Sequence, residues 1–453
     1  MTNSTLPTPR YWPVVFHSVA TFLGQSLMQV VDLVFCRDLG SVASATIGTG
    51  TAFLAWFIIL GIGLLSSLEF LIPHAYGSGQ SEKAEDFFRA GMGLSLLASL
   101  LSMVGLSVVA RLAPAYGMNP DLTGPIQQFC DLLAWSIPPI LMTPVMRIEL
   151  QCRGLPHAST EALMIGNLLN ILLNWLWVNG HGGFSAMGIQ GSAWANVGSR
   201  WFIILFLFWS LSKKTSIPSL AIERVFNSLK LHAREVLGLG FPAALHMMFE
   251  VGAFILVGLL ASRLDAHQNA AHAIAISLAS FVFMIPAGLS SAAALTMSHS
   301  LGLGQAEEAI RRGRHTLLLG LTYASFGSIL FFLLREPLVS LYTTDESTRR
   351  IGMQLILIAG FFQFGDALQV ILAGCLRGLG ETKTQAVMNA IGHWGLGIPL
   401  GLYLGIWKGL GVEGFWIGLC LGLFSVAALL LHRYLAFAAR LKAVNSSSFQ
   451  SSA

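Results

Sequence analysis

The sequence predicts an all-α protein that crosses a membrane twelve times. Of its 453 residues, 54% are hydrophobic and only 11% are charged, and the mean hydropathy is +0.69. A soluble domain carries about 25% charged residues, so this chain lacks the polar surface that water requires. Its apolar runs are long enough to cross a bilayer, and only helices satisfy their own backbone polar groups there. The composition therefore excludes a soluble enzyme, and the scattered net charge of +4 does not indicate a nucleic-acid partner.

The twelve spans are bounded by charged or Pro/Gly-rich breaks. They are predicted near 12–36, 44–75, 89–111, 126–148, 158–179, 190–212, 236–260, 270–300, 316–335, 351–376, 385–406 and 414–438. The two termini and the even-numbered gaps between spans hold 18 of the 26 Lys and Arg residues. Because cytoplasmic loops carry the excess of Lys and Arg, both termini are predicted to be cytoplasmic. The expected location is the plasma membrane, or the inner membrane if the source is bacterial.

An internal repeat divides the chain. Residues 60–84 align with 285–309 at an offset of 225, with nine identities in 25. Residues 153–164 align with 377–388 at an offset of 224, with six identities in 12, and GIQG at 188–191 matches GVEG at an offset of 223. Three matches at almost one offset indicate two homologous halves.

The repeat predicts two six-helix bundles. The N-terminal lobe is expected at 1–212, a cytoplasmic linker at 213–234 and the C-terminal lobe at 235–453. Six crossings return the chain to the same side of the membrane, so the two halves are related by an axis along the membrane normal. Repeats of this kind are typical of alternating-access transporters.

Acidic residues inside apolar spans are the best pointers to function, because a carboxylate at a helix centre costs about 2.5–3.5 kcal/mol on insertion scales. In the second half, Glu250 and Asp366 lie deep in spans seven and ten. His246 lies one turn before Glu250, and Gln363 and Gln369 flank Asp366 at i−3 and i+3. These carboxylates are predicted to bind a small cation or exchange a proton, although a neutral, hydrogen-bonded carboxyl is the alternative for Glu250 and a core histidine for His246.

In the first half, Asp32 lies in span one. Asn167, Asn170 and Asn174 form a polar stripe along span five, and Asn196 follows in span six. If Asp32 faces this stripe, one carboxylate and several amides form a second candidate site for Na⁺ or a proton. The alternative is that the amides only hold helices together.

Other polar residues are expected to be structural. Glu69 and Glu149 lie toward the cytoplasmic ends of their spans. No Cys-x-x-Cys pair occurs among the five cysteines, so neither a disulfide framework nor a structural metal is predicted. No cofactor is expected besides the coupling ion, H⁺ or Na⁺.

The chain resembles the multidrug and toxic compound extrusion (MATE) transporters over nearly its whole length. The resemblance is carried by VDLVFCRDLG at 31–40, LEFLIPHAYGSGQ at 68–80, NILLN at 170–174, GIQGSAWA at 188–195, GFPAALHMMFEV at 240–251, FFQFGDALQVILAGCLRGLG at 361–380 and GVEGFWIG at 411–418. It implies an antiporter with twelve helices in two lobes that exports amphipathic, often cationic, compounds in exchange for Na⁺ or H⁺. The partners so implied are a small organic molecule and the lipid bilayer, and the expected functional form is a monomer.

By position, the resemblance implies that Asp32, Glu250 and Asp366 are the family's acids of the first, seventh and tenth helices. Asn170, Asn174 and Asn196 resemble the positions that complete the cation site of the N-terminal lobe. Two residues depart from some relatives: Asn174 replaces a second acid, and Phe362 replaces a tyrosine. Both departures leave the choice of ion and of lobe open.

Three other classes of protein share some of these features. A major-facilitator transporter usually carries a DRxGRR-like run after its second helix, where this chain has GSGQSEKAEDFFRAG. A lipid-linked oligosaccharide flippase of similar fold stays an alternative, although the spans hold few of the Lys and Arg that its cavity would need. An intramembrane protease with Asp32 and Asp366 as its dyad is a remote one, because no Gly-x-Gly-Asp motif precedes Asp366.

Overall fold

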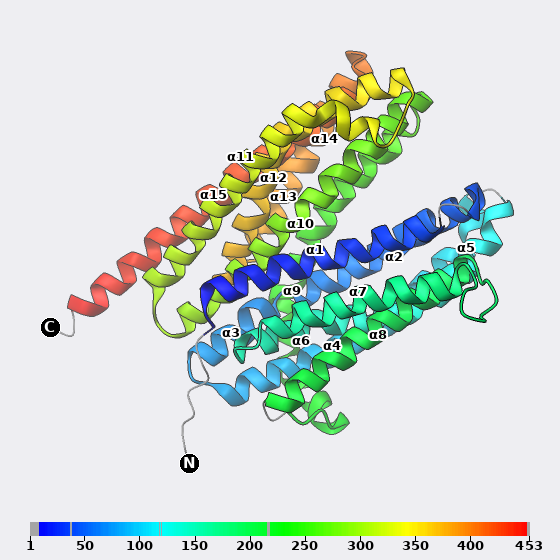
Figure 1. Cartoon of the computed structure of the whole chain (residues 1–453). Coiled ribbons are helices and arrows are strands. Elements are labelled where there is room, and N and C mark those ends of the chain that lie inside the picture. Colours follow the sequence, from blue (N-terminus) through cyan, green and yellow to red (C-terminus); the bar gives the residue numbers. More distant parts are fainter. Residues whose placement is uncertain (1–8, 37–38, 117, 119, 215–217, 451–453) are drawn as a thin grey trace. The chain divides into compact units, whose positions relative to one another are not determined.

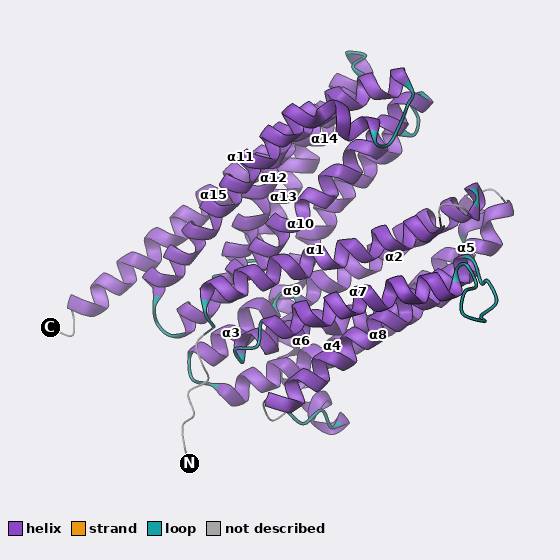
Figure 2. Cartoon of the chain, in the orientation of Figure 1, coloured by secondary structure: helices purple, strands orange, loops and turns teal. Residues whose placement is uncertain are grey.

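The computed structural model describes residues 9–36, 39–116, 118, 120–214 and 218–450, and these ranges contain helices joined by short loops and no strand (Figure 2). By length and composition, ten stretches of this described part could each cross a membrane. The helix His157–Trp177 and the helical stretch 383–407 complete the twelve predicted crossings. The prediction of an all-α membrane protein is thereby confirmed.

Contacts divide the chain into two compact units, Met1–Ala244 and Leu245–Ala453. The helices of the first unit appear in chain order in blue to green (Figure 1). They are α1 (Tyr11–Cys36), α2 (Ser41–Leu65), α3 (Leu68–Gly77), α4 (Ser81–Arg111), α5 (Pro120–Leu133), α6 (Ile137–Cys152), α7 (His157–Trp177), α8 (Ile189–Lys214) and the beginning of α9 (Ile222–Ala261). Of the predicted linker at 213–234, Lys213 and Lys214 end α8, residues 215–217 lie outside the described residues, and the part from Ile222 onward forms the first turns of α9.

Two predicted spans of the first unit are interrupted helices. The second span is α2 followed by α3, and the break is at Ser66 and Ser67. Their hydroxyls donate to the main-chain oxygens of Gly63 at 2.7 Å and Leu64 at 3.0 Å, which supplies partners for carbonyls at the break. The fourth span is α5 and α6 joined by a short 3-10 turn at Ala134–Ser136, with prolines following at the start of α6. Such interruptions are tolerated where other groups satisfy the freed backbone.

The second unit contains the rest of α9 and the helices drawn in green to red (Figure 1). These are α10 (Ala266–Gly302), α11 (Ala306–Ser340), α12 (Glu346–Gly378), α13 (Lys383–Asn389), α14 (Ile398–Leu402) and α15 (Gly411–Gln450). The predicted eleventh span is one continuous helical stretch, in which α13 and α14 alternate with the π-helical segments Ala390–Gly397 and Tyr403–Trp407. π-helical turns often occur at functional sites, and the first of these carries His393.

The repeat is visible in the backbone of its turns. Gly79 after α3 and Gly304 after α10 occupy equivalent positions and have φ angles of +75° and +74°. The main-chain amide of the next residue, Gln80 or Gln305, donates to the main-chain oxygen of Ala75 or Ser300, in each case at 2.9 Å. Gly188 and Gly411, which are 223 residues apart, both have a φ of +56°. A left-handed backbone favours glycine, so the repeated glycines mark the same helix ends in both halves.

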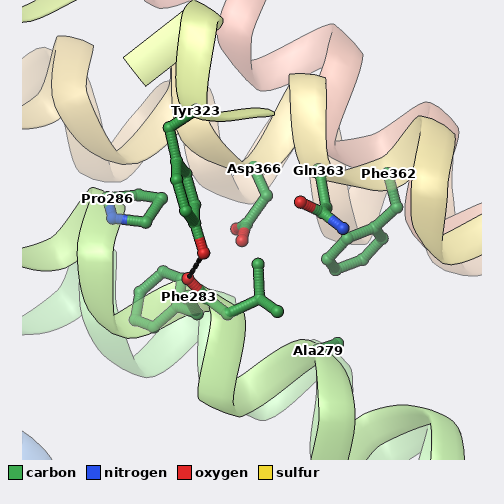
Figure 3. A pocket seen from close by; sticks show the side chains of 8 residues that line it. Ala279, Phe283, Pro286, Tyr323, Phe362, Gln363 and Asp366 are labelled. Carbon is green, nitrogen blue, oxygen red and sulfur yellow. Dashed lines mark hydrogen bonds between the residues drawn. The ribbon is translucent and has the colours of Figure 1, made fainter. Parts of the chain in front are cut away.

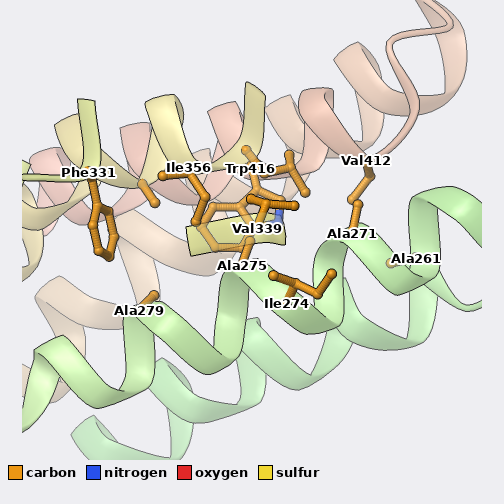
Figure 4. Packing of buried hydrophobic residues seen from close by; sticks show 12 residues of the cluster. Ala261, Ala271, Ile274, Ala275, Ala279, Phe331, Val339, Ile356, Val412 and Trp416 are labelled. Carbon is orange, nitrogen blue, oxygen red and sulfur yellow. The ribbon is translucent and has the colours of Figure 1, made fainter. Parts of the chain in front are cut away.

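The core of the second unit lies where α10, α12 and α15 meet (Figure 4). Small residues on α10, among them Ala271 and Ala275, let Trp416 of α15 pack at the centre of the cluster. Trp416 is fully buried, and its indole Nε1 donates to His272 Nδ1 at 3.1 Å. This satisfies the polar atom of a large buried aromatic ring and fixes the histidine beside it.

Candidate functional site

The structure brings Asp32 together with the predicted asparagines. Asp32 of α1 accepts hydrogen bonds from the amide nitrogens of Asn170 at 3.1 Å and Asn174 at 2.9 Å through Oδ1. Its Oδ2 accepts from Asn196 of α8 at 2.7 Å. Asn167, the fourth member of the stripe, instead donates to the main-chain oxygen of Gly24 at 2.9 Å. Three helices of the first unit thus converge on one carboxylate.

An arginine that the motif analysis did not select completes this group. Arg200 of α8 lies one turn after Asn196, and its Nε donates to Asn196 Oδ1 at 2.7 Å. It also interacts electrostatically with Asp32. An arginine within an otherwise apolar span was the signal that could have identified it.

In the second unit, Glu250 and Asp366 are both buried and interact electrostatically with each other. Glu250 of α9 interacts with the side chain of Gln369 of α12. Gln369 Oε1 in turn lies 3.2 Å from His393 Nε2, on the π-helical segment. Gln369 therefore interacts with both Glu250 and His393, and His393 is a candidate site residue that sequence reasoning did not find.

Asp366 lines a small cavity between α10, α11 and α12 (Figure 3). Its volume is about 10 Å³, which is room for one water molecule. Gln363 and Tyr323 share the lining, and both polar atoms of the buried Gln363 amide have no hydrogen-bond partner. The Tyr323 hydroxyl donates to the main-chain oxygen of Val282 at 3.1 Å. The cavity therefore has a phenolic oxygen, from Tyr323 of α11, although Phe362 supplies none.

Phe362 and His246 are both buried in the second unit. The Phe362 ring packs against Phe254 at 5.7 Å and against Trp416 at 5.8 Å, between centroids. His246 interacts electrostatically with His393 and with Arg377, which also acts on Glu250. Arg377 Nη2 donates to Ser290 Oγ of α10 at 3.1 Å. The sequence predicts Arg377 only as a cytoplasmic charge, and its electrostatic interaction with Glu250 depends on how α9 and α12 pack.

Glu69 and Glu149 lie in ion pairs of the first unit. Glu69 Oε1 is 3.3 Å from Arg147 Nη2. Glu149 is fully buried and accepts from Arg153 Nε at 2.5 Å and from the Tyr76 hydroxyl at 2.7 Å. Carboxylates with arginine partners of this kind hold helices together, which agrees with the structural role expected for both.

The two carboxylate groups have different chemical capabilities. Asp32 is surrounded by N–H donors, which stabilise an ionised carboxylate. Glu250 and Asp366 interact electrostatically with each other, and the single positive charge of Arg377 acts on Glu250, so a proton or a small cation would relieve their remaining repulsion. Within the described residues, no group of three or more His, Cys, Asp or Glu side chains could hold a metal ion.

A family model described as MatE matches residues 18–176 and 242–403 of this chain. The multidrug resistance protein MdtK of Yersinia pseudotuberculosis is 31% identical over 422 residues, which cover 91% of each chain. The multidrug resistance protein NorM of Vibrio vulnificus is 31% identical over 425 residues, 92% of each chain.

Solved structures show the same fold. The eukaryotic MATE transporter AtDTX14 superimposes with a TM-score of 0.85 at 20% identity, covering 95% of this chain and 97% of its own. A MOP superfamily transporter from Pyrococcus furiosus superimposes with a TM-score of 0.86 at 17% identity, covering 98% and 99%.

Proposed function

The chain belongs to the MatE family of multidrug and toxic compound extrusion transporters, and from this we propose that it is a secondary antiporter. It exports amphipathic, often cationic, organic compounds in exchange for H⁺ or Na⁺ by alternating access. Its relatives are named as multidrug resistance proteins, which supports this substrate class. The names favour neither the oligosaccharide flippase nor the intramembrane protease.

The observation that carries the proposal is the pair of buried carboxylates in the second unit. Glu250 and Asp366 interact electrostatically with each other, and Glu250 also interacts with Arg377 and with the amide of Gln369. Two negative charges at this depth repel, so binding one positive ion stabilises the pair. An ion entering down a potential of 100 mV supplies about 2.3 kcal/mol per charge, which can drive the export of a cargo molecule.

The neighbours of the pair support the same role. The partnerless amide of Gln363 lies in the cavity with Asp366, and amide oxygens are suitable ligands for a hard cation. The cavity has room for one water molecule, and a water there would carry an arriving proton. We place the coupling ion at Glu250 and Asp366, with Gln369 and His393 orienting Glu250, and we keep Asp32 as the titrating group of the first unit.

Proteoliposomes test the proposal. Purified protein is reconstituted, and transport of a fluorescent organic cation is followed under an imposed pH gradient, an imposed Na⁺ gradient or neither. The wild type is expected to accumulate substrate only under a gradient, and Glu250→Gln and Asp366→Asn are expected to fall to the rate of protein-free liposomes. Asp32→Asn reports separately on the first unit.

A control variant distinguishes loss of coupling from general damage. Asp131 of α5 is a carboxylate within a predicted span, but it accepts a hydrogen bond from Ser107 at 2.8 Å and belongs to neither group. Asp131→Asn is expected to transport like the wild type. Gradient-driven transport that survives in Glu250→Gln and Asp366→Asn would remove the coupling role of the pair. Transport that needs no gradient would remove antiport.

Further properties follow from the proposal. We infer that the protein functions as a monomer in the plasma membrane, or in the inner membrane of a bacterium, with both termini cytoplasmic. The asymmetry of Lys and Arg between the two sets of loops supports this orientation.

A further inference from the structure

Arg200 changes what the Asp32 group can bind. The arginine is on α8, one turn beyond Asn196, and a hydrogen-bonded chain runs from Arg200 Nε to Asn196 and from Asn196 to Asp32, with 2.7 Å at each step. Guanidinium groups are always protonated, so this group carries a fixed positive charge. The charge acts on Asp32 directly as well as through the amide.

The arginine fixes which end of Asn196 faces the carboxylate. Arg200 Nε can only donate a hydrogen bond, so the atom that it contacts must be the amide oxygen. The amide nitrogen is then turned toward Asp32 Oδ2, where it donates. As long as Arg200 holds the oxygen, Asn196 cannot offer it to an ion beside Asp32.

Asn174 is fixed in the same sense by the backbone. Its amide nitrogen donates to Asp32 Oδ1 and also to the main-chain oxygen of Asn170, both at 2.9 Å. Both partners are hydrogen-bond acceptors. If the Asn174 amide were turned over, its oxygen would face these two oxygens and could not bond to either. Two of the three amides around Asp32 therefore present N–H groups to it, and the third, Asn170, donates as well.

Such a shell does not fit Na⁺. A hard cation needs oxygen ligands, whereas N–H groups and a guanidinium direct positive charge at the place where it would sit. We propose that Arg200 is a specificity-determining residue that takes the place of a metal cation at Asp32, so that the Asp32 site does not bind Na⁺. This inference rests on the proposed antiport and concerns which ion the first unit can use.

The second half of the repeat shows that the arginine is not needed to build the helix. The offset of 223 that relates Gly188 to Gly411 places Leu423 of α15 at the position of Arg200. Leu423 is fully buried among apolar residues. The same helix position accommodates an aliphatic side chain in one half and carries a charge beside a carboxylate in the other.

Binding of ²²Na⁺ to the purified full-length protein in detergent tests the inference. The measurement uses choline to hold the ionic strength constant and involves neither a gradient nor a substrate. The wild type and Asp32→Asn are expected to bind the same amount of Na⁺, because Asp32 contributes no Na⁺ site. Arg200→Met removes the charge and frees Asn196 to turn, so this variant is expected to gain Na⁺ in an amount equimolar with the protein.

Two further variants assign the gain. It should vanish in the double variant Arg200→Met with Asp32→Asn, and Arg200→Lys, which retains charge and donor, should show no gain. The inference is overturned if Asp32→Asn lowers the Na⁺ bound by the wild type, or if Arg200→Met elutes as a monodisperse protein and binds no additional Na⁺. If Arg200→Met fails to fold, the amounts of Na⁺ bound by the wild type and by Asp32→Asn still decide whether Asp32 contributes a Na⁺ site.

The result is independent of the test of antiport. Gradient-driven transport reports on Glu250 and Asp366 in the second unit, whereas the ²²Na⁺ measurement compares variants at Asp32 and Arg200 in the first. Any Na⁺ bound in the second unit is common to all the variants compared and cancels.

Discussion

Buried carboxylates in this protein differ in the charge of their partners. Glu149 is fully buried but is bonded to Arg153 and Tyr76. Asp366 is also buried, and it has another carboxylate, Glu250, as its electrostatic neighbour. A paired charge stabilises the fold only while its partner is present, and a repelling pair is stable only with an added proton or ion.

We predict that the fold depends on Arg153 as the partner of Glu149. Replacing it with methionine leaves Glu149 as an uncompensated buried charge, and removing one partner of a buried pair costs about 3–5 kcal/mol. Arg153→Met is therefore expected to lower the melting temperature in detergent markedly.

The double variant Arg153→Met with Glu149→Gln is the control. It removes the orphaned charge and is expected to recover most of the loss, because glutamine can still accept from Tyr76. Equal stability of the single variant and the wild type would mean that the pair contributes nothing.

Sequence reasoning found the acids but not their partners. Asp32, Glu250 and Asp366 were identified because a charge in an apolar run is costly. Arg377 and His393 were missed, because their relation to Glu250 depends on α9, α12 and the π-helical segment being brought together. Spacing along one helix identified Gln369, but only the packing shows that it faces Glu250 while Gln363 faces the cavity.

At the scale of elements, α10 and α12 pack closely because glycine lies at their contact. A Cβ atom at Gly374 would be 2.3 Å from the main-chain oxygen of Ser290, and one at Gly378 would be 2.7 Å from that of Ala294. These distances leave no room for a side chain, and backbone atoms cannot turn aside. The small residues thereby hold Asp366 on α12 against α10, in the manner of close helix pairs in membranes.

We therefore predict that Gly374→Val separates the two helices. Overpacking costs about 1–3 kcal/mol in well-packed cores, and here the clash is with the backbone. The expected result is a lower melting temperature in detergent. The matched control is Gly238→Val in α9, where a Cβ would meet nothing within 4 Å. If both variants unfold at the same temperature, the loss of stability comes from the helix propensity of valine and not from packing between α10 and α12.

The start of α12 provides a test with pH. Asp345 caps this helix by accepting from the amide of Thr348 at 2.7 Å, and that hydrogen bond lowers the pKa of the Asp345 carboxyl below its ordinary value of 3.8. A depressed pKa stabilises the helix start above the ordinary value, and this contribution is lost as the pH falls through the folded-state pKa.

Amide hydrogen exchange in the first turn of α12, corrected for intrinsic rates, measures this effect. Protection in the wild type is expected to fall as the pH drops below 3.8. Asp345→Asn should retain protection that does not vary over this range, because asparagine also caps helices but does not titrate. Asp345→Ala should be less protected throughout. Identical pH profiles for the wild type and Asp345→Asn would refute the titration of this cap.

The elements themselves followed from the sequence more closely than their interruptions did. Runs of apolar residues between charged breaks identified all twelve crossings, since hydrocarbon leaves the backbone no alternative to a helix. The break at Ser66 and Ser67 and the π-helical turn at His393 involve no charge or change of hydropathy. The break depends on serine hydroxyls that bond the freed carbonyls, and the π-helical segment packs closely against α15.

On the scale of the whole molecule, the repeat is the property that the sequence established most firmly. Nine identities in 25 residues predicted the relation, and the shared left-handed glycines at the helix ends confirm it in three dimensions. The halves nevertheless place their acids differently. The offset of 225 that relates the first windows places Val257 at the position of Asp32, so each unit uses the common scaffold to hold its own polar group.

The six-plus-six repeat and the Lys and Arg count together predict which loops face the cytoplasm. The turn between α10 and α11 precedes Arg311, Arg312 and Arg314, whereas the loop between α11 and α12 is on the opposite side of one crossing.

Single cysteines at Gln305 and Thr344, introduced into a variant lacking the five native cysteines, report on these two loops. On intact cells, a membrane-impermeant maleimide is expected to label Thr344→Cys alone, and Gln305→Cys should react only after permeabilisation. Because one helix separates the two positions, the reverse labelling pattern would mean that the whole chain has the opposite orientation in the membrane. Labelling of both on intact cells would mean that α11 does not cross the membrane.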